Sequence, residues 1–170
     1  MQELIAPSKV EFYNSAWQML GEREMLMDEI SAIMGIDKVM FRECVLDDFS
    51  IAMRMSWASR RITARVEDMA YSLLGLFGVN MPMLYGEGER AFIRLQEEIM
   101  KSYDDQSLFA WGSTRNTHSG LLAPSPAAFS ASSKIARSES GSKWNLIPYS
   151  ITNLGLSIEM RMIPWAMESK

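Results

Sequence analysis

Apolar residues recur at helical spacing along much of this chain, which predicts several amphipathic helices. The first helix is expected over residues 23–34, and Gly35 follows as a residue suited to the left-handed turn that ends a helix. Its apolar stripe consists of Leu26, Ile30, Ile33 and Met34. A second helix is predicted over residues 51–59. Three residues before it are able to cap its first turn: Asp47, Asp48 and Ser50.

The longest unbroken apolar face predicts a helix over residues 63–77. Thr63 is its expected cap and Gly78 its expected stop. The face consists of Val66, Met69, Ala70, Leu73, Leu74 and Phe77. We expect this helix to be the most buried element, with the last three of these residues in the core.

A glycine-rich stretch, Tyr85-Gly86-Glu87-Gly88-Glu89, leads into a further predicted helix. The apolar face of that helix is Ala91, Phe92, Leu95, Ile99 and Tyr103. Glycines before a helix are able to present backbone N–H groups to a phosphate. Two carboxylates in the stretch would repel such an anion. The pattern therefore favours a tight turn in which Glu87 or Glu89 complements the helix dipole.

Short extended segments are predicted near both ends of the chain and after the last helix. Residues 9–13, followed by the turn-like pair Asn14-Ser15, indicate a strand or hairpin. Residues 108–111 are short and apolar like a strand. The partly alternating segment 147–163 predicts two strands around residues 153–155. Between them lies a loop-rich region in which a short helix is expected at residues 125–129, with Ser125 as cap and Pro126 in the first helical position.

Composition indicates an ordinary globular protein, because 48% of residues are apolar and 22% are charged. The net charge of −4 and the scattered basic residues argue against a nucleic-acid partner. The single cysteine, Cys44, excludes an internal disulfide framework, and the single histidine, His118, makes a metal site or a histidine-based triad improbable. With no apolar run long enough for a membrane span, we expect a soluble cytoplasmic protein.

A charged cluster formed by Arg60, Arg61, Arg65, Glu67 and Asp68 lies at the start of the predicted helix 63–77. It is interpreted as a solvated face rather than an ion-pair latch, since exposed pairs contribute only about 0–1 kcal/mol each. The clustered methionines indicate a loosely specified core or a surface that faces a partner.

Several long motifs, in a fixed order, resemble the second half of the fungal heterokaryon-incompatibility (HET) domain and its C-terminal border. They are Met1-Gln2-Glu3-Leu4-Ile5-Ala6-Pro7, Val10-Glu11-Phe12-Tyr13, Trp57-Ala58-Ser59-Arg60, Thr63, Glu67-Asp68-Met69-Ala70-Tyr71-Ser72-Leu73-Leu74-Gly75, Met81-Pro82-Met83-Leu84-Tyr85-Gly86-Glu87-Gly88-Glu89 and Asp105-Gln106-Ser107-Leu108-Phe109-Ala110-Trp111. A weaker similarity, carried by residues 120–129, extends to about residue 160. The upstream motifs of such domains are absent from this sequence.

The resemblance implies an α+β fragment, mainly helical with peripheral short strands. It would be the C-terminal half of a Toll/interleukin-receptor-like (TIR-like) α/β HET domain that lacks its first strands. The expected organisation is residues 1–112 as that half domain, 113–146 as a Ser/Pro/Gly-rich connection, and 147–170 as the start of a β-rich segment. Apolar surface left open by the absent strands predicts self-association or a protein partner.

The resemblance also implies a function: a signalling or effector segment of a fungal self/non-self recognition protein that leads to cell death. Glu3 stands where the catalytic glutamate of NAD-cleaving TIR enzymes would fall, so the parent protein is alternatively an NAD hydrolase with NAD as substrate. A carboxylate there would stabilise the positive charge that develops as the nicotinamide bond breaks. We expect this chain alone to be inactive and to hold no cofactor. A third alternative is a truncated regulator that binds a full-length HET protein.

Overall fold

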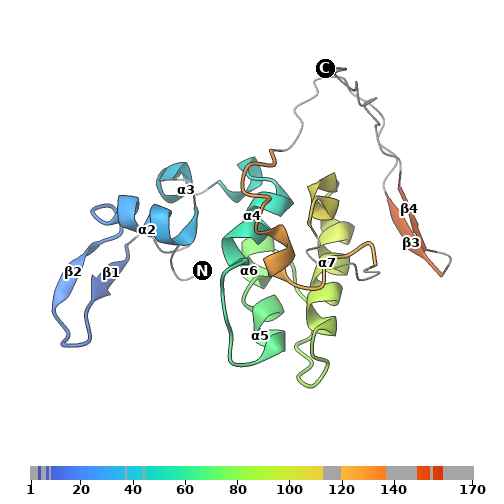
Figure 1. Cartoon of the computed structure of the whole chain (residues 1–170), viewed down its shortest axis with the longest axis horizontal. Coiled ribbons are helices and arrows are strands. Elements are labelled where there is room, and N and C mark those ends of the chain that lie inside the picture. The colour runs from blue at the N-terminus through green and yellow to red at the C-terminus, as the bar shows by residue number, and fades with distance from the viewer. Residues whose placement is uncertain are drawn as a thin grey trace, which may run out of the picture. The chain divides into compact units, whose positions relative to one another are not determined.

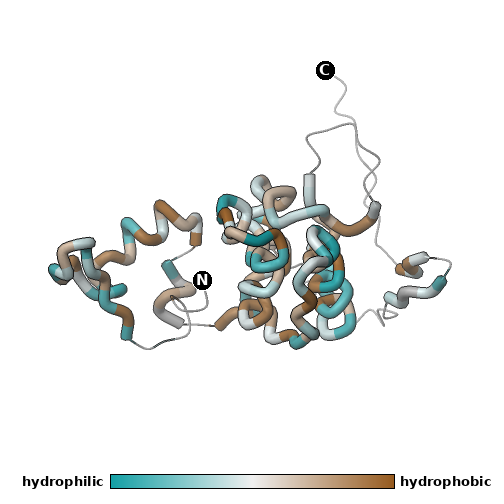
Figure 2. The backbone as a smooth tube through the Cα atoms, turned by 90° about the horizontal axis from the view of Figure 1, so that it is seen from below, coloured by the Kyte–Doolittle hydropathy of each residue, from teal (hydrophilic) through white to brown (hydrophobic). Residues whose placement is uncertain are grey.

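A computed structural model describes Leu4, Pro7 and residues 9–36, 38–43, 45–112, 120–136, 149–153 and 155–158. The chain forms two compact units, Met1–Ser138 and Glu139–Lys170. The described part of the first unit contains one hairpin and a series of helices, and that of the second contains a hairpin (Figure 1). Hydrophobic and hydrophilic residues are interspersed along the helical part of the first unit, as in amphipathic helices (Figure 2). No helix among the described residues is long and apolar enough to cross a membrane.

The predicted N-terminal hairpin is confirmed. Strand β1 (Glu11–Tyr13) pairs with antiparallel β2 (Met19–Glu22), with an irregular register after Phe12. The side-chain oxygen of Asn14 accepts hydrogen bonds from the backbone N–H groups of Ala16 and Gln18, each at 2.9 Å. A short polar side chain thus closes the turn by replacing a backbone acceptor.

Helix α2 (Met27–Met34) confirms the first predicted helix, and Gly35 ends it at a φ of 67°. The helix begins four residues later than the predicted start at residue 23, because residues 23–25 form a turn. Ile33 belongs to the predicted apolar stripe but is 73% exposed. A second short helix, α3 (Lys38–Glu43), was not predicted, and a 3-10 helix, η1 (Leu46–Asp48), follows it.

Helix α4 (Ile51–Ala58) confirms the second predicted helix, and Ser50 is the residue that caps it. The Ser50 hydroxyl accepts a hydrogen bond from the Met53 N–H at 3.1 Å, whereas Asp47 and Asp48 lie in η1. The N–H of Ile51 donates to the Asp105 carboxylate at 2.8 Å and that of Ala52 to the Ser107 hydroxyl at 3.0 Å. Side chains from far along the chain therefore satisfy the free donors of this buried helix end.

The single helix predicted over residues 63–77 is wrong, because the structure has two: α5 (Val66–Tyr71) and α6 (Leu74–Phe77). Thr63 does not cap α5, since its hydroxyl donates to the Arg65 carbonyl at 2.6 Å and Arg65 is extended. The predicted stop is confirmed, as Gly78 takes the left-handed conformation at a φ of 60°. Leu73 and Phe77 are fully buried as expected, but Leu74 is only half-buried.

Helix α7 (Arg90–Ser102) confirms the last predicted helix and packs against α5. Its buried face contains the expected apolar residues Ala91, Phe92, Leu95 and Ile99. The strand predicted at residues 108–111 is wrong: the 3-10 helix η2 (Gln106–Phe109) occupies this stretch, capped by Asp105. η2 lies against α4.

Residues 120–136, predicted from the sequence to belong to a connection, pack into the first unit. The short helix η3 (Pro126–Phe129) has Pro126 in its first turn as predicted, although Ser125 makes no side-chain cap bond. It packs on α4, and Phe129 is fully buried. The buried amide of Gln96 on α7 accepts from the Ala123 N–H at 2.9 Å and donates to its carbonyl at 2.8 Å.

The second unit contains an antiparallel hairpin of β3 (Ser150–Thr152) and β4 (Gly155–Ser157). This confirms the two strands predicted around residues 153–155. Gly155 begins β4 at a φ of 126°, a conformation that favours glycine.

Candidate functional site

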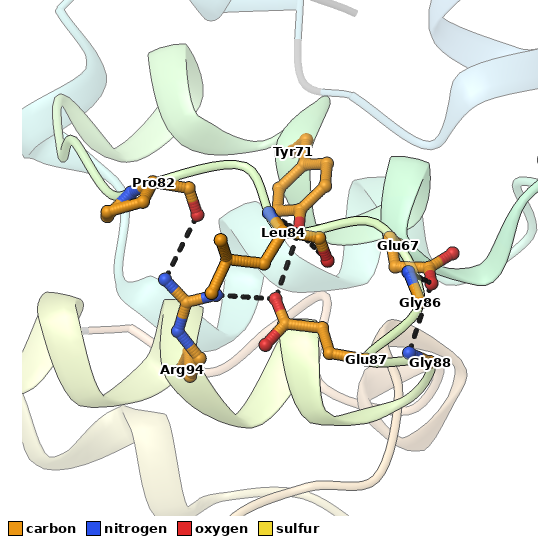
Figure 3. A network of polar contacts seen from close by, with 8 residues as sticks. All are labelled: Glu67, Tyr71, Pro82, Leu84, Gly86, Glu87, Gly88 and Arg94. Carbon is orange, nitrogen blue, oxygen red and sulfur yellow. Dashed lines mark hydrogen bonds and ion pairs between the residues drawn. The ribbon is translucent and has the colours of Figure 1, made fainter.

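A network of polar contacts surrounds the loop of residues 81–89, between α6 and α7 (Figure 3). Three side chains hold this loop, which we call the clasped loop. They are Glu67 and Tyr71 on α5 and Arg94 on α7. Because α5 packs against α7, the three side chains reach the loop from both helices.

Glu67 holds the glycine-rich end of the clasped loop. Its Oε1 atom accepts hydrogen bonds from the backbone N–H groups of Gly86 at 2.8 Å and Gly88 at 3.1 Å. Both glycines have positive φ, 102° and 60°, so that a side chain at either position would strain the turn. Glu67 is only 8% exposed. Its pKa lies below the ordinary value of 4.5, because its own N–H and those of Gly86 and Gly88 donate to the charged carboxylate.

Tyr71 holds the middle of the clasped loop. Its hydroxyl accepts from the Leu84 N–H at 2.7 Å, and both the Leu84 carbonyl and Glu87 Oε1 lie 2.9 Å from it as acceptors for its proton. Burial first, and then the hydrogen bond to Glu87, raise the pKa of Tyr71 above its usual value of 10. The hydroxyl is therefore a structural donor and acceptor at neutral pH.

Arg94 closes the network from α7. Its Nη1 atom forms an ion pair with Glu87, and its Nη2 atom donates to the Pro82 carbonyl at 3.0 Å. Both side chains of the ion pair are largely buried, which reduces screening by solvent. The carboxylate of Glu87 is thus fixed by Arg94 and Tyr71 together.

Tyr85 forms the outer side of the loop. Its hydroxyl donates to Asp68 Oδ1 at 3.0 Å, and the guanidinium carbon of Arg65 lies 5.0 Å from its ring centre. The Tyr71 and Tyr85 rings meet edge to face with centroids 5.5 Å apart. The hydrogen bond to Asp68, together with burial, raises the pKa of Tyr85 above 10.

These contacts correct one interpretation of the sequence. Glu67 and Asp68 are not simply part of a solvated face, because both bind the loop some 20 residues away. Glu87 pairs with Arg94, and Glu89 stands at the N-cap position of α7 without a side-chain cap bond. The structural reading of the glycines holds, as Glu67 already occupies the N–H groups that an anion would need. The sequence signal for this contact was a glutamate in the first turn of a helix, Glu67, followed later by the Gly-x-Gly pattern of Gly86 and Gly88.

The other candidate residues are mostly outside the described part. Glu3, the candidate catalytic glutamate, lies there together with Cys44 and His118. Of the residues near Glu3, Leu4 and Pro7 are described, and the Nη1 atom of Arg23 donates to their carbonyls at 3.0 Å and 2.9 Å. The described residues include no group of three or more His, Cys, Asp or Glu side chains placed to bind a metal.

Arg54 on α4 is another buried charged residue. It is 2% exposed, and its guanidinium carbon lies 5.0 Å from the Phe77 ring centre and 5.1 Å from that of Tyr103. Its Nη1 atom donates to the Leu76 carbonyl at 3.3 Å. Two aromatic faces and a carbonyl therefore offset part of the cost of burying this cation.

Replacing Glu67 by glutamine is expected to destabilise the fold at neutral pH and to have progressively less effect in acid. Because the folded-state pKa of Glu67 is lowered, its contribution is fully present above the ordinary pKa of 4.5 and is lost as pH falls through the folded value. Urea unfolding from neutral pH down to about pH 3 measures this trend. Glu89→Gln, at an exposed position of the same loop, is the control. A loss of stability that is the same at every pH would contradict the charged role.

Comparisons with known proteins show which proteins this chain is similar to in sequence. A family model described as a domain of unknown function (DUF8212) matches residues 90–164. The vegetative incompatibility protein HET-E-1 of Podospora anserina is 47% identical over 102 residues, which are 59% of this chain and 8% of the relative. No solved structure matches the chain. The chain is therefore similar in sequence to a fungal incompatibility protein of which it spans a small part, and this supports the coarse resemblance found in its motifs.

Proposed function

We propose that this chain is a signalling or effector segment of a fungal self/non-self recognition protein whose activation kills fused cells of unlike genotype. The observation that carries the proposal is the 47% identity over 102 residues to a vegetative incompatibility protein. Because the matched residues span 8% of this relative, the proposed role is that of one part of a larger protein.

The geometry of the clasped loop favours a binding role for this segment over a catalytic one. The carboxylates of Glu67 and Glu87 both accept hydrogen bonds that fix them in place. The Tyr71 hydroxyl is engaged in the same way and titrates far above neutral pH. These groups hold a loop in one conformation, which suits a surface that must be recognised.

A segment exchange tests the proposal. The matching 102-residue segment of HET-E-1 would be replaced by the corresponding residues of this chain and expressed in Podospora anserina. We expect hyphal death on fusion of unlike strains to persist, and to be lost when the exchanged segment carries a core-disrupting Leu73→Asp change. A chimera that behaves like a deletion of the segment would contradict an equivalent role.

NAD cleavage by the parent protein is the second candidate function, with Glu3 as its carboxylate. The favouring observation is the pair of hydrogen bonds from buried Arg23, which restrain the backbone of Leu4, the residue after Glu3, and of Pro7. Catalysis by a carboxylate needs such restraint, because misplacement of a reacting group by about 1 Å can reduce the rate roughly a hundredfold.

Residues 1–170 incubated with NAD are expected to release no nicotinamide above background. One carboxylate without bordering strands and loops cannot orient a dinucleotide, and good orientation supplies roughly 7–11 kcal/mol of the barrier reduction in favourable systems. The measurement is chromatographic detection of nicotinamide. A longer chain that restores an upstream HET-like half, with and without Glu3→Gln, is the comparison. Equal cleavage by the two longer chains would exclude Glu3, and cleavage by the short chain would show that it is a complete enzyme.

A further inference from the structure

Three consecutive residues of the clasped loop have large apolar side chains that are exposed to solvent. Met83 is 61% exposed, Leu84 53% and Tyr85 55%. Val66 on α5, next to the Glu67 that binds the loop, is 56% exposed. We call these four residues the Tyr85 face. Neighbouring exposed apolar side chains on a folded surface are candidates for contact with another molecule.

The backbone that displays the Tyr85 face is held firmly. Tyr71 binds the Leu84 N–H, Glu67 binds the N–H groups of Gly86 and Gly88, and Arg94 binds the Pro82 carbonyl (Figure 3). These bonds restrain the loop on both sides of its exposed residues. A preformed loop loses little conformational entropy when it binds, so its apolar side chains contribute more of their burial to affinity.

The charges beside Tyr85 distinguish the kind of partner. Arg65 lies over the Tyr85 ring and Asp68 accepts from its hydroxyl, so that one positive and one negative side chain flank the same aromatic residue. A partner with a single sign of charge would be attracted by one of them and repelled by the other. A second copy of the same face, turned by a two-fold rotation, presents the opposite order of charges.

We propose that the Tyr85 face is the contact of a symmetric dimer of this chain. Two copies of α5 pack antiparallel about Val66, because this arrangement brings Arg65 of one copy opposite Asp68 of the other, twice. The Tyr85 and Leu84 side chains then pack across the two-fold axis. The proposal is independent of the proposed function, since it rests on the surface alone.

The small size of the Tyr85 face sets the strength of the dimer. Stable interfaces bury roughly 800 Å² on each partner, which is more than four half-exposed side chains supply. The dimer is therefore weak and in rapid exchange with the monomer.

Sedimentation equilibrium of residues 1–170, from micromolar to millimolar concentration, tests the dimer. We expect a reversible monomer–dimer equilibrium that Leu84→Asp weakens by about tenfold or more. Ile33→Asp, at a similarly exposed apolar position on α2, is the matched control and leaves the dissociation constant unchanged. Circular dichroism and thermal melting confirm that both variants are folded. A monomer at all concentrations, or an association that Ile33→Asp weakens as much as Leu84→Asp, overturns the proposal.

Charge reversal tests the antiparallel geometry. Arg65→Glu and Asp68→Arg are each expected to weaken the dimer, since each places like charges opposite one another. The double variant exchanges the two signs and is expected to recover most of the affinity. Failure of the double variant to associate more tightly than either single variant overturns the pairing of Arg65 with Asp68.

Discussion

Replacing Phe129 by alanine is expected to lower the free energy of unfolding by about 3–5 kcal/mol. Phe129 lies in η3, is fully buried, and packs with η3 against α4. Removing its ring leaves a cavity in a part of the core that the rigid helix α4 cannot close. Urea unfolding at equilibrium, followed by circular dichroism, measures the change.

Leu121→Ala provides the control for Phe129→Ala. Leu121 lies in the same segment but is exposed, so its loss is expected to change stability by no more than about 0.5 kcal/mol. Equal effects of the two substitutions would show that η3 does not pack on α4. A large difference would establish residues 120–136 as part of the core of the first unit.

Leu73→Ala is expected to cost about 2–5 kcal/mol, and Leu74→Ala distinctly less. Leu73 is fully buried at the junction of α5 and α6, whereas Leu74 is half-buried at the start of α6. A continuous helix over residues 63–77 would place both leucines on its core face. Thermal and urea unfolding of this adjacent pair therefore distinguish the two-helix structure from the single helix, which equal losses would favour.

Local pattern was sufficient to predict α7 and α4. The apolar residues of α7 keep the 3.6-residue period for three turns, and its boundaries follow a glycine-rich turn. Ser50 caps α4 through a bond between neighbours three residues apart, which a single sequence can show. Both hairpins were also predictable, because turn residues separate their apolar runs.

The break between α5 and α6 could not be predicted from the apolar pattern, which continues through it. The Leu73 N–H bonds to the Ala70 carbonyl, three residues back, so the chain tightens there without any helix-breaking residue. The apolar run at 108–111 was equally ambiguous, because so short a run is compatible with a strand and with a 3-10 helix. The run is helical because Asp105 caps η2, and the same carboxylate accepts from the Ile51 N–H at the start of α4.

The role of Glu67 could not be predicted from the sequence for a different reason. In the sequence it is one of five neighbouring charges, and nothing local separates it from the rest. Its partners are N–H groups 19 and 21 residues away that become available only because Gly86 and Gly88 take positive φ. The candidate site therefore depends on tertiary pairing between α5 and the loop before α7.

The pairing of Gln96 with Ala123 limits where this gene can be shortened or joined to another. The amide of Gln96 meets both backbone groups of Ala123 in the way that a neighbouring strand would. A stop codon or fusion junction that removes residue 123 leaves this buried amide without that partner, at the cost of an unsatisfied polar group. The product would spend more time unfolded and be cleared by cellular proteases. The shortest gene product that keeps the helices of the first unit stably folded therefore extends past α7 into residues 120–136.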